Sequence, residues 1–344
     1  MAIKRIGILT GGGDCPGLNP TIRAIVRKTL KENIPVTGIR NGWKGLIEKD
    51  TVELDLNSVS GILPKGGTIL GTSRTNPYKE KGDLGKVKKN LNALKLDALI
   101  VIGGDDTLGA ASKLSKEGLK IVGVPKTIDN DLSCTDFTFG FDTAVNIATE
   151  AIDRLHTTAE SHHRIMVVEI MGRHAGWIAT YAGIAGGADV LLIPEIPIDM
   201  DEVCGIIKAR HARGKDFSIV VVAEGAKLKD QELFLKTKKK DAFGNVLLGG
   251  IGHAIGKELG ERTGFETRVT VLGHIQRGGT PSAFDRVLAT RFGVKAVELV
   301  LNGEFGQMAS LRGNEVVSVP LEAAVGTLKT VDMRLYEIAK IFFG

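Results

Sequence analysis

The sequence predicts an α/β fold made of two three-layer α/β/α domains with mainly parallel sheets. Short apolar runs recur along the chain, each followed by a glycine-containing turn and a stretch with helical periodicity. Continuous apolar strands that alternate with helices are typical of parallel sheets covered on both faces. The 344 residues also exceed the usual size of one domain, so we expect two domains.

The elements of this fold follow from the apolar runs and the periodic stretches between them. The expected strands are RIGILT, DALIVIGG, KIVGVPKT, RIMVVEIMG, DVLLIPE, SIVVVAEG and RVTVLG. The expected helices lie near Leu18–Lys31, Leu84–Leu94, Thr107–Lys116, Asp142–Thr157, Ala175–Gly186, Met200–Ala212, Ile251–Leu259 and Ser282–Leu301. Ligands of doubly wound sheets bind outside the carboxyl ends of the strands, so functional residues should directly follow the apolar runs.

The charge balance favours an anionic ligand. The net charge is +5 and the isoelectric point is near 9.0, which fits a small anion or a nucleic acid. The one dense basic run, KTKKKD at Lys236–Asp241, lacks interleaved aromatic residues and lies in the polar stretch KLKDQELFLKTKKKDAFGN, which we expect to form an exposed hairpin or loop. Nucleic acid is therefore the less favoured partner.

The cysteines and the apolar runs favour a cytoplasmic protein. Cys15, Cys134 and Cys204 are odd in number and widely spaced, as expected for free thiols in a reducing compartment. The apolar run at the N-terminus is too short for a signal peptide, and no run approaches the length of a membrane span.

The first candidate motif is LTGGGDCPGLNPTIRAIVR, which includes Gly12 and follows the first predicted strand. Glycines between a strand and a helix let backbone N–H groups approach a bound phosphate. No GK[ST] follows, so this is not a Walker motif. A strand–turn–helix connection with glycines for steric reasons is the alternative.

The second motif, LIVIGGDDTLGA, places two adjacent carboxylates where a phosphate could bind. Gly103 and Gly104 form the turn, and Asp105 is a suitable Mg²⁺ ligand because that ion is usually held by one or two carboxylates and substrate phosphates. Asp106 precedes Thr107 and the predicted helix, so it is also a candidate N-cap, which contributes on the order of 1 kcal/mol.

The third motif, GVPKTIDNDL, again follows a strand directly. Lys126, Thr127, Asp129 and Asp131 lie within six residues of one another. A carboxylate beside a substrate hydroxyl can accept its proton during phosphoryl transfer. Asp129 is therefore the candidate base and Asp131 a supporting carboxylate near the metal, although a plain turn rich in Asp and Asn is the alternative.

A fourth set of polar residues lies at or beside the later predicted strands. Arginine forks match phosphate oxygens and a glutamate can accept sugar hydroxyls, which suggests a phosphosugar site. The members are Arg164, Met171, Gly172, Arg173, Glu224, Arg268, His274 and Arg277. Each arginine alone could be a solvated surface residue, and His274 could be structural. We interpret His162 and His163 as structural.

Taken together, these motifs resemble the 6-phosphofructokinase family. GGGDCPGLN, GGTILGTSR, GGDDTL, PKTIDND, SHHR, MGRHAG, VAEGA and GHIQRGG occur in the order and spacing of that family, over nearly the whole chain. The resemblance implies two α/β domains with the active site in the cleft between them, and Mg²⁺-dependent phosphorylation of fructose 6-phosphate on its 1-hydroxyl. We expect the phosphoryl-donor domain to comprise residues 1–141 and about 278–308, and the fructose 6-phosphate domain residues 142–277 and about 309–344.

The resemblance also implies the role of each site residue. Asp129 is the base, Asp105 holds the metal, and Lys126, Asp106 and Arg173 assist catalysis. The sugar is held by Thr127, Met171, Gly172, Arg173 and Glu224. Its 6-phosphate is held by His274, Arg277, Arg164 and Arg268, the last two from a neighbouring subunit of a homodimer or homotetramer. The donor is held by Gly12, Arg74, Gly104, Asp106, Thr107 and Lys126.

Two positions resemble the pyrophosphate-dependent branch of the family. ATP-dependent members have glycine at the position of Asp106 and often at that of Lys126, which leaves room for an α-phosphate. Like charges about 4 Å apart cost roughly 4 kcal/mol at an effective dielectric near 20. That would weaken ATP binding by roughly three decades. We therefore expect diphosphate as donor and a readily reversible reaction.

Three alternatives remain. In an ATP-dependent enzyme, Asp106 would be only a helix cap with Lys126 as its ion-pair partner. An NAD or lipid kinase would share the GGD turn but not PKTIDND and GHIQRGG, and a sugar-phosphate sensor would not need Asp129.

Arg23 and Arg27 match the effector site of ATP-dependent members, whereas His156 replaces an expected arginine there.

Overall fold

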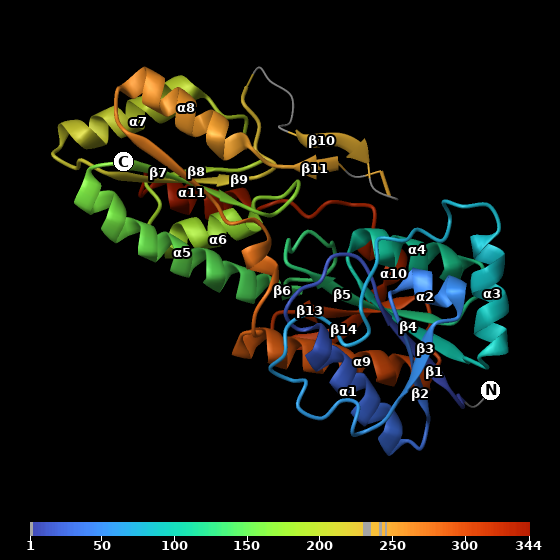
Figure 1. Cartoon of the computed structure of the whole chain (residues 1–344). Coiled ribbons are helices and arrows are strands. Elements are labelled where there is room, and N and C mark those ends of the chain that lie inside the picture. Colours follow the sequence, from blue (N-terminus) through green and yellow to red (C-terminus); the bar gives the residue numbers. More distant parts are fainter. Residues whose placement is uncertain (1–2, 230–234, 241–242, 245) are drawn as a thin grey trace.

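The chain folds into two α/β domains, one at the upper left and one at the lower right of Figure 1. The computed structural model describes residues 3–229, 235–240, 243–244 and 246–344. Each domain has one main sheet with helices on both of its faces, so the predicted fold class is confirmed. Across the described residues, no helix combines the length and apolar character needed to cross a membrane.

The first domain contains an eight-stranded sheet whose centre is parallel. Its strands follow the order β14 (Glu315–Pro320), β13 (Gln307–Arg312), β5 (Ile121–Thr127), β4 (Ala98–Gly103), β1 (Ile6–Thr10), β2 (Val36–Ile39) and β3 (Thr51–Leu54), and β6 (Phe139–Gly140) also pairs with β5. Only β3 and β14 run antiparallel to their neighbours. The carboxyl ends of β1, β4 and β5 are therefore adjacent, as a ligand site at that edge requires.

The central strands of this sheet are buried at every position, because successive side chains point to opposite faces and helices cover both. Ile100 and Ile102 of β4 pack with α1 (Leu18–Lys31) and α9 (Ala283–Asn302) on one face. Leu99 and Val101 pack with the helices of the other face. Those helices are α2 (Trp43–Glu48), α3 (Asp83–Ala93), α4 (Asp105–Lys116) and α10 (Leu321–Ala324).

The second domain has a four-stranded, fully parallel sheet. Its order is β12 (Thr267–Val271), β7 (Ile165–Ile170), β9 (Ser218–Ala223) and β8 (Val190–Leu192). One face packs with α5 (Phe141–His162), α6 (Trp177–Ala185) and α11 (Met333–Lys340), and the other with α7 (Met200–Ala212) and α8 (Ile251–Thr263). All seven predicted strands and all eight predicted helices are present, with shifted bounds for several.

The polar stretch before α8 forms an antiparallel hairpin of β10 (Leu235–Lys240) and β11 (Val246–Leu248). The predicted hairpin is thus confirmed, although residues 230–234, 241–242 and 245 lie outside the described part. The basic run forms a strand at residues 236–240 rather than a loop. Figure 1 shows that this hairpin extends from the second domain toward α4 of the first.

The expected domain boundary near residue 309 is wrong. Strands β13 and β14 belong to the sheet of the first domain, because the buried start of β13 pairs with Val122 and Gly123 of β5. Only α11 packs on the second domain, against α6 and β8. The chain consequently crosses between the domains three times, at residues 140–141, 278–282 and 325–332.

Candidate active site

One cavity of about 50 Å³ lies between the domains, at the adjacent carboxyl ends of β1, β4 and β5. All six residues predicted to hold the donor line it. Its lining comprises Gly12, Gly13, Arg74, Gly104, Asp105, Asp106, Thr107, Lys126, Thr127, Ile128, Asp129 and Asp131 from the first domain, and Arg173, Phe243 and Arg277 from the second. This cavity lies between the two domains, where the active site is predicted.

Two cationic side chains contact the glycine loop that follows β1. Lys126 Nζ donates a hydrogen bond to the carbonyl of Gly13 at 2.5 Å, and Arg277 Nη1 donates to the carbonyl of Asp14 at 3.2 Å. A Cβ at residue 13 would meet the guanidinium of Arg277, so glycine at this position lets Arg277 lie where it does. Lys126 is buried, and burial lowers the pKa of its ammonium group. The arrangement suits an anion that satisfies both cations.

Helix α4 begins two residues earlier than predicted, which corrects the interpretation of Asp106. The helix starts at Asp105, and Gly104 is its N-cap. Asp106 therefore lies inside the first turn and is not the N-cap. Its charge still interacts favourably with the positive end of the helix dipole. Gly103 ends strand β4, and a Cβ there would collide with Thr107 in the first turn of α4. The turn between β4 and α4 therefore requires glycine at this position.

The two adjacent carboxylates of α4 have different partners. Asp105 Oδ1 accepts a hydrogen bond from the backbone N–H of Gly326 at 3.0 Å, in the segment that crosses from α10 to α11. Asp106 Oδ2 lies 3.9 Å from Nη1 of Arg173, which forms an ion pair across the cleft. Asp106 thus joins the donor half of the site to the half predicted for the sugar.

The carboxylates after β5 form the buried acidic part of the site. Asp129 is 4% exposed, its N–H donates to Thr127 Oγ1 at 3.0 Å, and its Oδ1 has no hydrogen-bond partner among the described residues. Burial, and then the charge of Asp129, raise the pKa of Asp131 to about 7. An unpartnered buried carboxylate oxygen at a strand end is suited to accept a proton from a bound hydroxyl.

On the second domain, the turn after β7 directs Arg173 into the cavity. Glu224 Oε1 accepts hydrogen bonds from the N–H groups of Gly172 at 3.4 Å and Arg173 at 3.2 Å. Burial, followed by the charge of Asp129, raises the pKa of Glu224. Gln276 Oε1 accepts from the N–H of Met171 at 3.0 Å. The predicted sugar residues of this turn therefore lie together.

Gln276 and His274 belong to the short 3₁₀ helix η1 (Gly273–Arg277). His274 is exposed and is not among the residues that line the cavity. Gln276 was not predicted, although it is fully buried and lies between two predicted residues of the motif GHIQRGG. Its position inside that motif was the available signal.

Arg164 and Arg268 lie at the opposite edge of the second sheet. Arg164 precedes β7 and Arg268 lies near the start of β12, whereas Glu224 follows the carboxyl end of β9. Arg164 Nε is 3.0 Å from Glu266 Oε2, and Arg268 also pairs with Glu266. Both arginines lie at the amino ends of these strands, as the predicted strands that begin with them imply, and so lie away from the carboxyl ends that hold the other site residues.

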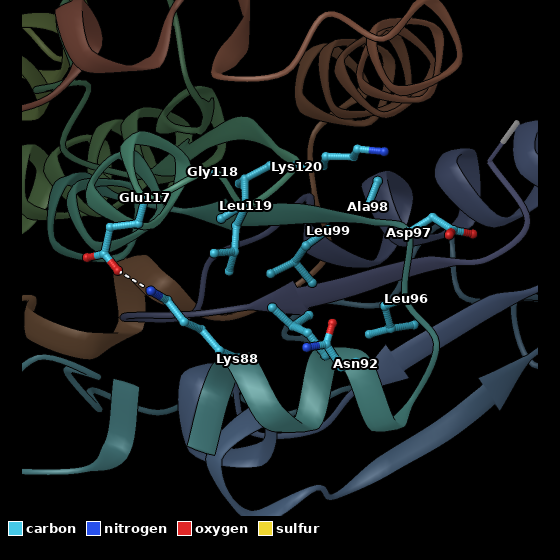
Figure 2. A pocket seen from close by; sticks show the side chains of 12 residues that line it. Lys88, Asn92, Leu96, Asp97, Ala98, Leu99, Glu117, Gly118, Leu119 and Lys120 are labelled. Atoms are coloured by element: carbon cyan, nitrogen blue, oxygen red, sulfur yellow. Dashed lines mark ion pairs between the residues drawn. The ribbon is translucent and has the colours of Figure 1, made fainter. Parts of the chain in front are cut away.

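A larger cavity, of about 310 Å³, lies at the amino ends of β4 and β5 (Figure 2). It has an apolar floor that includes Leu99, and an ion pair of 2.7 Å between Lys88 and Glu117 at its side. None of the predicted site residues lines it, and its position is opposite to the edge where parallel sheets bind ligands.

The fold and this site define a class of protein, a two-domain α/β protein with charged side chains in the cavity between its domains. A family model described as "Phosphofructokinase" matches residues 5–300. A Streptomyces coelicolor protein named "Pyrophosphate--fructose 6-phosphate 1-phosphotransferase" is 59% identical over 342 residues, which are 99% of this chain and 100% of that protein. Another from that organism, "ATP-dependent 6-phosphofructokinase 3", is 53% identical over 98% of this chain and 99% of its own.

Among solved structures, Pichia pastoris phosphofructokinase in the T-state superposes with a TM-score of 0.84 at 33% identity. The match covers 99% of this chain and 36% of that one, so this chain spans about a third of the yeast chain. The chain belongs to the phosphofructokinase family, and its predicted family is confirmed.

Proposed function

We propose that this protein is a diphosphate–fructose 6-phosphate 1-phosphotransferase. It transfers a phosphoryl group reversibly from diphosphate to the 1-hydroxyl of fructose 6-phosphate, in glycolysis and gluconeogenesis in the cytoplasm. The observation that carries the proposal is the pair of charged side chains in the cavity, buried Lys126 and the first-turn carboxylate of Asp106. The names of the relatives at 57–59% identity support the same donor.

Lys126 and Arg277 favour a compact donor with high charge density. Both now donate to neutral carbonyl oxygens of the glycine loop, and a diphosphate group would give them an anionic partner instead. Asp106 disfavours a third phosphate in line with the first two by like charge. The cavity of about 50 Å³ is also small compared with roughly 300–1,000 Å³ for pockets that enclose drug-sized ligands.

In the proposed reaction, Asp129 accepts the proton of the sugar 1-hydroxyl as the oxygen attacks the donor. Its buried, unpartnered Oδ1 supports this role. Lys126 stabilises the negative charge that develops on the leaving phosphate. Arg173, aligned through Glu224, orients the sugar and offsets charge between the two substrates.

Mg²⁺ is the implied cofactor, and the acidic residues of the cleft fit it. No group of three or more His, Cys, Asp or Glu side chains able to hold a metal ion occurs in the part of the chain that the structure describes. Mg²⁺ usually has one or two carboxylate ligands, and substrate phosphates and water complete its shell. Asp105, supported by Asp131, would hold the ion, which supplies charge neutralisation on the phosphates.

The acceptor half of the site is proposed to be shared between subunits. Arg277 and His274 come from this chain, whereas Arg164 and Arg268 lie at the far edge of the second sheet. They would complete the 6-phosphate site of a neighbouring copy in a homodimer or homotetramer. In this chain both arginines form ion pairs with Glu266, and the three residues make a charged cluster.

ATP is the second candidate donor, because the ion pair with Arg173 offsets part of the charge on Asp106. Relatives named as ATP-dependent are 53–54% identical to this chain. Initial rates with magnesium diphosphate and magnesium ATP, at saturating fructose 6-phosphate, decide between the two. We expect diphosphate to give a kcat/KM at least about a hundredfold higher, given the size of the charge effect. A preference for ATP would contradict the proposal.

A further inference from the structure

We infer that Phe243 is a second determinant of donor specificity and that it excludes the nucleoside of a nucleotide. This inference rests on the proposed function and extends it to a residue that the sequence motifs did not predict. Phe243 lines the donor cavity together with Arg74 and Asp106, although it comes from the other domain. It lies between β10 and β11, on the hairpin that extends toward α4 (Figure 1).

The chemistry of the cavity lining makes Phe243 unusual. The other lining residues are glycines, charged residues and threonines, apart from Ile128, which is only 1% exposed. Phosphate oxygens need hydrogen-bond donors and positive charge, and an aromatic ring supplies neither in the strength of an arginine or a lysine. Phe243 therefore adds apolar volume to a cavity whose other accessible lining is polar or glycine.

The direction from which Phe243 approaches points to the nucleoside. Two phosphates occupy the glycine loop between Lys126 and Arg277 in the proposed donor complex. A longer donor would extend past Asp106 on α4, which is the side that the hairpin approaches. Asp106 would then oppose a third phosphate by charge, and Phe243 would oppose the bulkier nucleoside by volume.

An aromatic ring can also stack on a purine, which would favour ATP instead. Stacking needs a slot as wide as a base beside the ring. The cavity that Phe243 lines is small, about 50 Å³, and shows no slot of that width beside the ring among the described residues. We therefore favour exclusion, and the two roles predict opposite effects of removing the ring.

Tripolyphosphate separates the effect of a third phosphate from that of a nucleoside. We would measure kcat/KM for diphosphate, tripolyphosphate and ATP, each as its magnesium complex, in the wild type, Phe243→Ala, Asp106→Gly and the double variant. Asp106→Gly should raise the values for tripolyphosphate and ATP by similar factors, between about tenfold and a thousandfold. Phe243→Ala should raise the kcat/KM for ATP by a factor at least about ten times larger than the factor for tripolyphosphate.

Two results would overturn the inference. If Phe243→Ala changes ATP and tripolyphosphate alike, the ring does not distinguish a nucleoside. If the kcat/KM for ATP falls relative to that for tripolyphosphate in Phe243→Ala, the ring stacks on the base. Phe243→Leu, which retains part of the apolar volume, should give an intermediate ratio and serves as the matched control for a variant that folds poorly.

A spectroscopic test does not depend on turnover. The native tryptophans, Trp43 and Trp177, are buried and also fluoresce. The emission of the wild type with and without diphosphate gives their contribution. Phe243→Trp should change its emission on addition of diphosphate beyond that background, and no such change would overturn the placement of residue 243 at the donor. Wild-type use of diphosphate tests the proposed function separately, since it does not depend on Phe243 discriminating a nucleoside.

Discussion

The two halves of the cleft differ in how completely one chain builds them. On the donor side, Lys126, Asp105 and Asp129 lie at adjacent strand ends, and the first two already have hydrogen-bond partners. On the acceptor side, Arg173 is in place, but Arg164 and Arg268 lie at the far edge of their sheet. One chain therefore positions all the residues that we propose for phosphoryl transfer, whereas we propose that recognition of the 6-phosphate needs a second chain.

The largest effect is expected from Asp129→Ser on the donor side. Loss of a general base should lower kcat by about 10²–10⁴-fold. The KM for fructose 6-phosphate should change by less than about threefold, because arginines and not this carboxylate are proposed to bind the sugar phosphate. Steady-state kinetics check both values. Asp153→Ser, at an exposed position of α5, is the control, and a variant at residue 129 with near-normal kcat would exclude this base.

A hybrid experiment tests whether the acceptor side is shared. Arg164→Ala should raise the KM for fructose 6-phosphate at least about tenfold, through loss of a charge-assisted contact to the 6-phosphate. When this variant is refolded together with Asp129→Ser, half of the sites in mixed dimers would combine two intact residues. Random mixing then predicts recovery of roughly a quarter of the wild-type activity measured at low fructose 6-phosphate.

Each of those variants refolded alone is the control for the hybrid. Activity in the mixture that equals the average of the two controls would show that each site takes all its residues from one chain. The comparison between the two halves would then be wrong on the acceptor side.

The smallest effect concerns Asp285, at the junction of the two domains. Its Oδ2 accepts hydrogen bonds from the N–H of Thr143 at 2.8 Å and from Thr143 Oγ1 at 2.5 Å. Burial raises the pKa of this carboxyl from 3.8 to about 6. Its protonated form therefore stabilises the fold at low pH, and that contribution is lost as pH rises from about 4 to about 6.

Asp285→Asn should consequently stabilise the protein more at pH 8 than at pH 5. An asparagine retains one carbonyl oxygen for both bonds and carries no charge. The gain at pH 8 should be on the order of 1–3 kcal/mol in the free energy of unfolding. Denaturant unfolding at the two pH values checks it, with wild type as reference. A larger gain at pH 5 would contradict the assigned direction.

The sequence predicted the parts of the fold whose signal is local. Continuous apolar runs gave the central strands, because a strand buried on both faces has no polar alternation to obscure it. Strand β14 was missed because it is only partly buried, and β2 because it has four residues, one of them glycine. The domain boundary failed at β13 because pairing with β5 is a contact between segments more than 180 residues apart.

In the candidate site, too, residues with a local sequence signal were predicted and contacts between distant segments were not. Lys126 and Asp129 were predicted because they lie in one short motif after one strand. The N–H of Gly326 on Asp105 joins residues 221 positions apart, and no local pattern indicates it. The N-cap interpretation of Asp106 failed because the α4 helix begins at Asp105, although aspartate is a favoured cap. Phe243 was missed because a hairpin of the other domain brings it to the cleft.

The threefold crossing of the chain between its domains has a consequence for protease digestion and for truncation. A single cut in any one crossing leaves the domains joined through the other two, so a nicked chain should still migrate as one particle under native conditions. Neither domain is a continuous segment, and no single stop codon or start site can yield either of them whole.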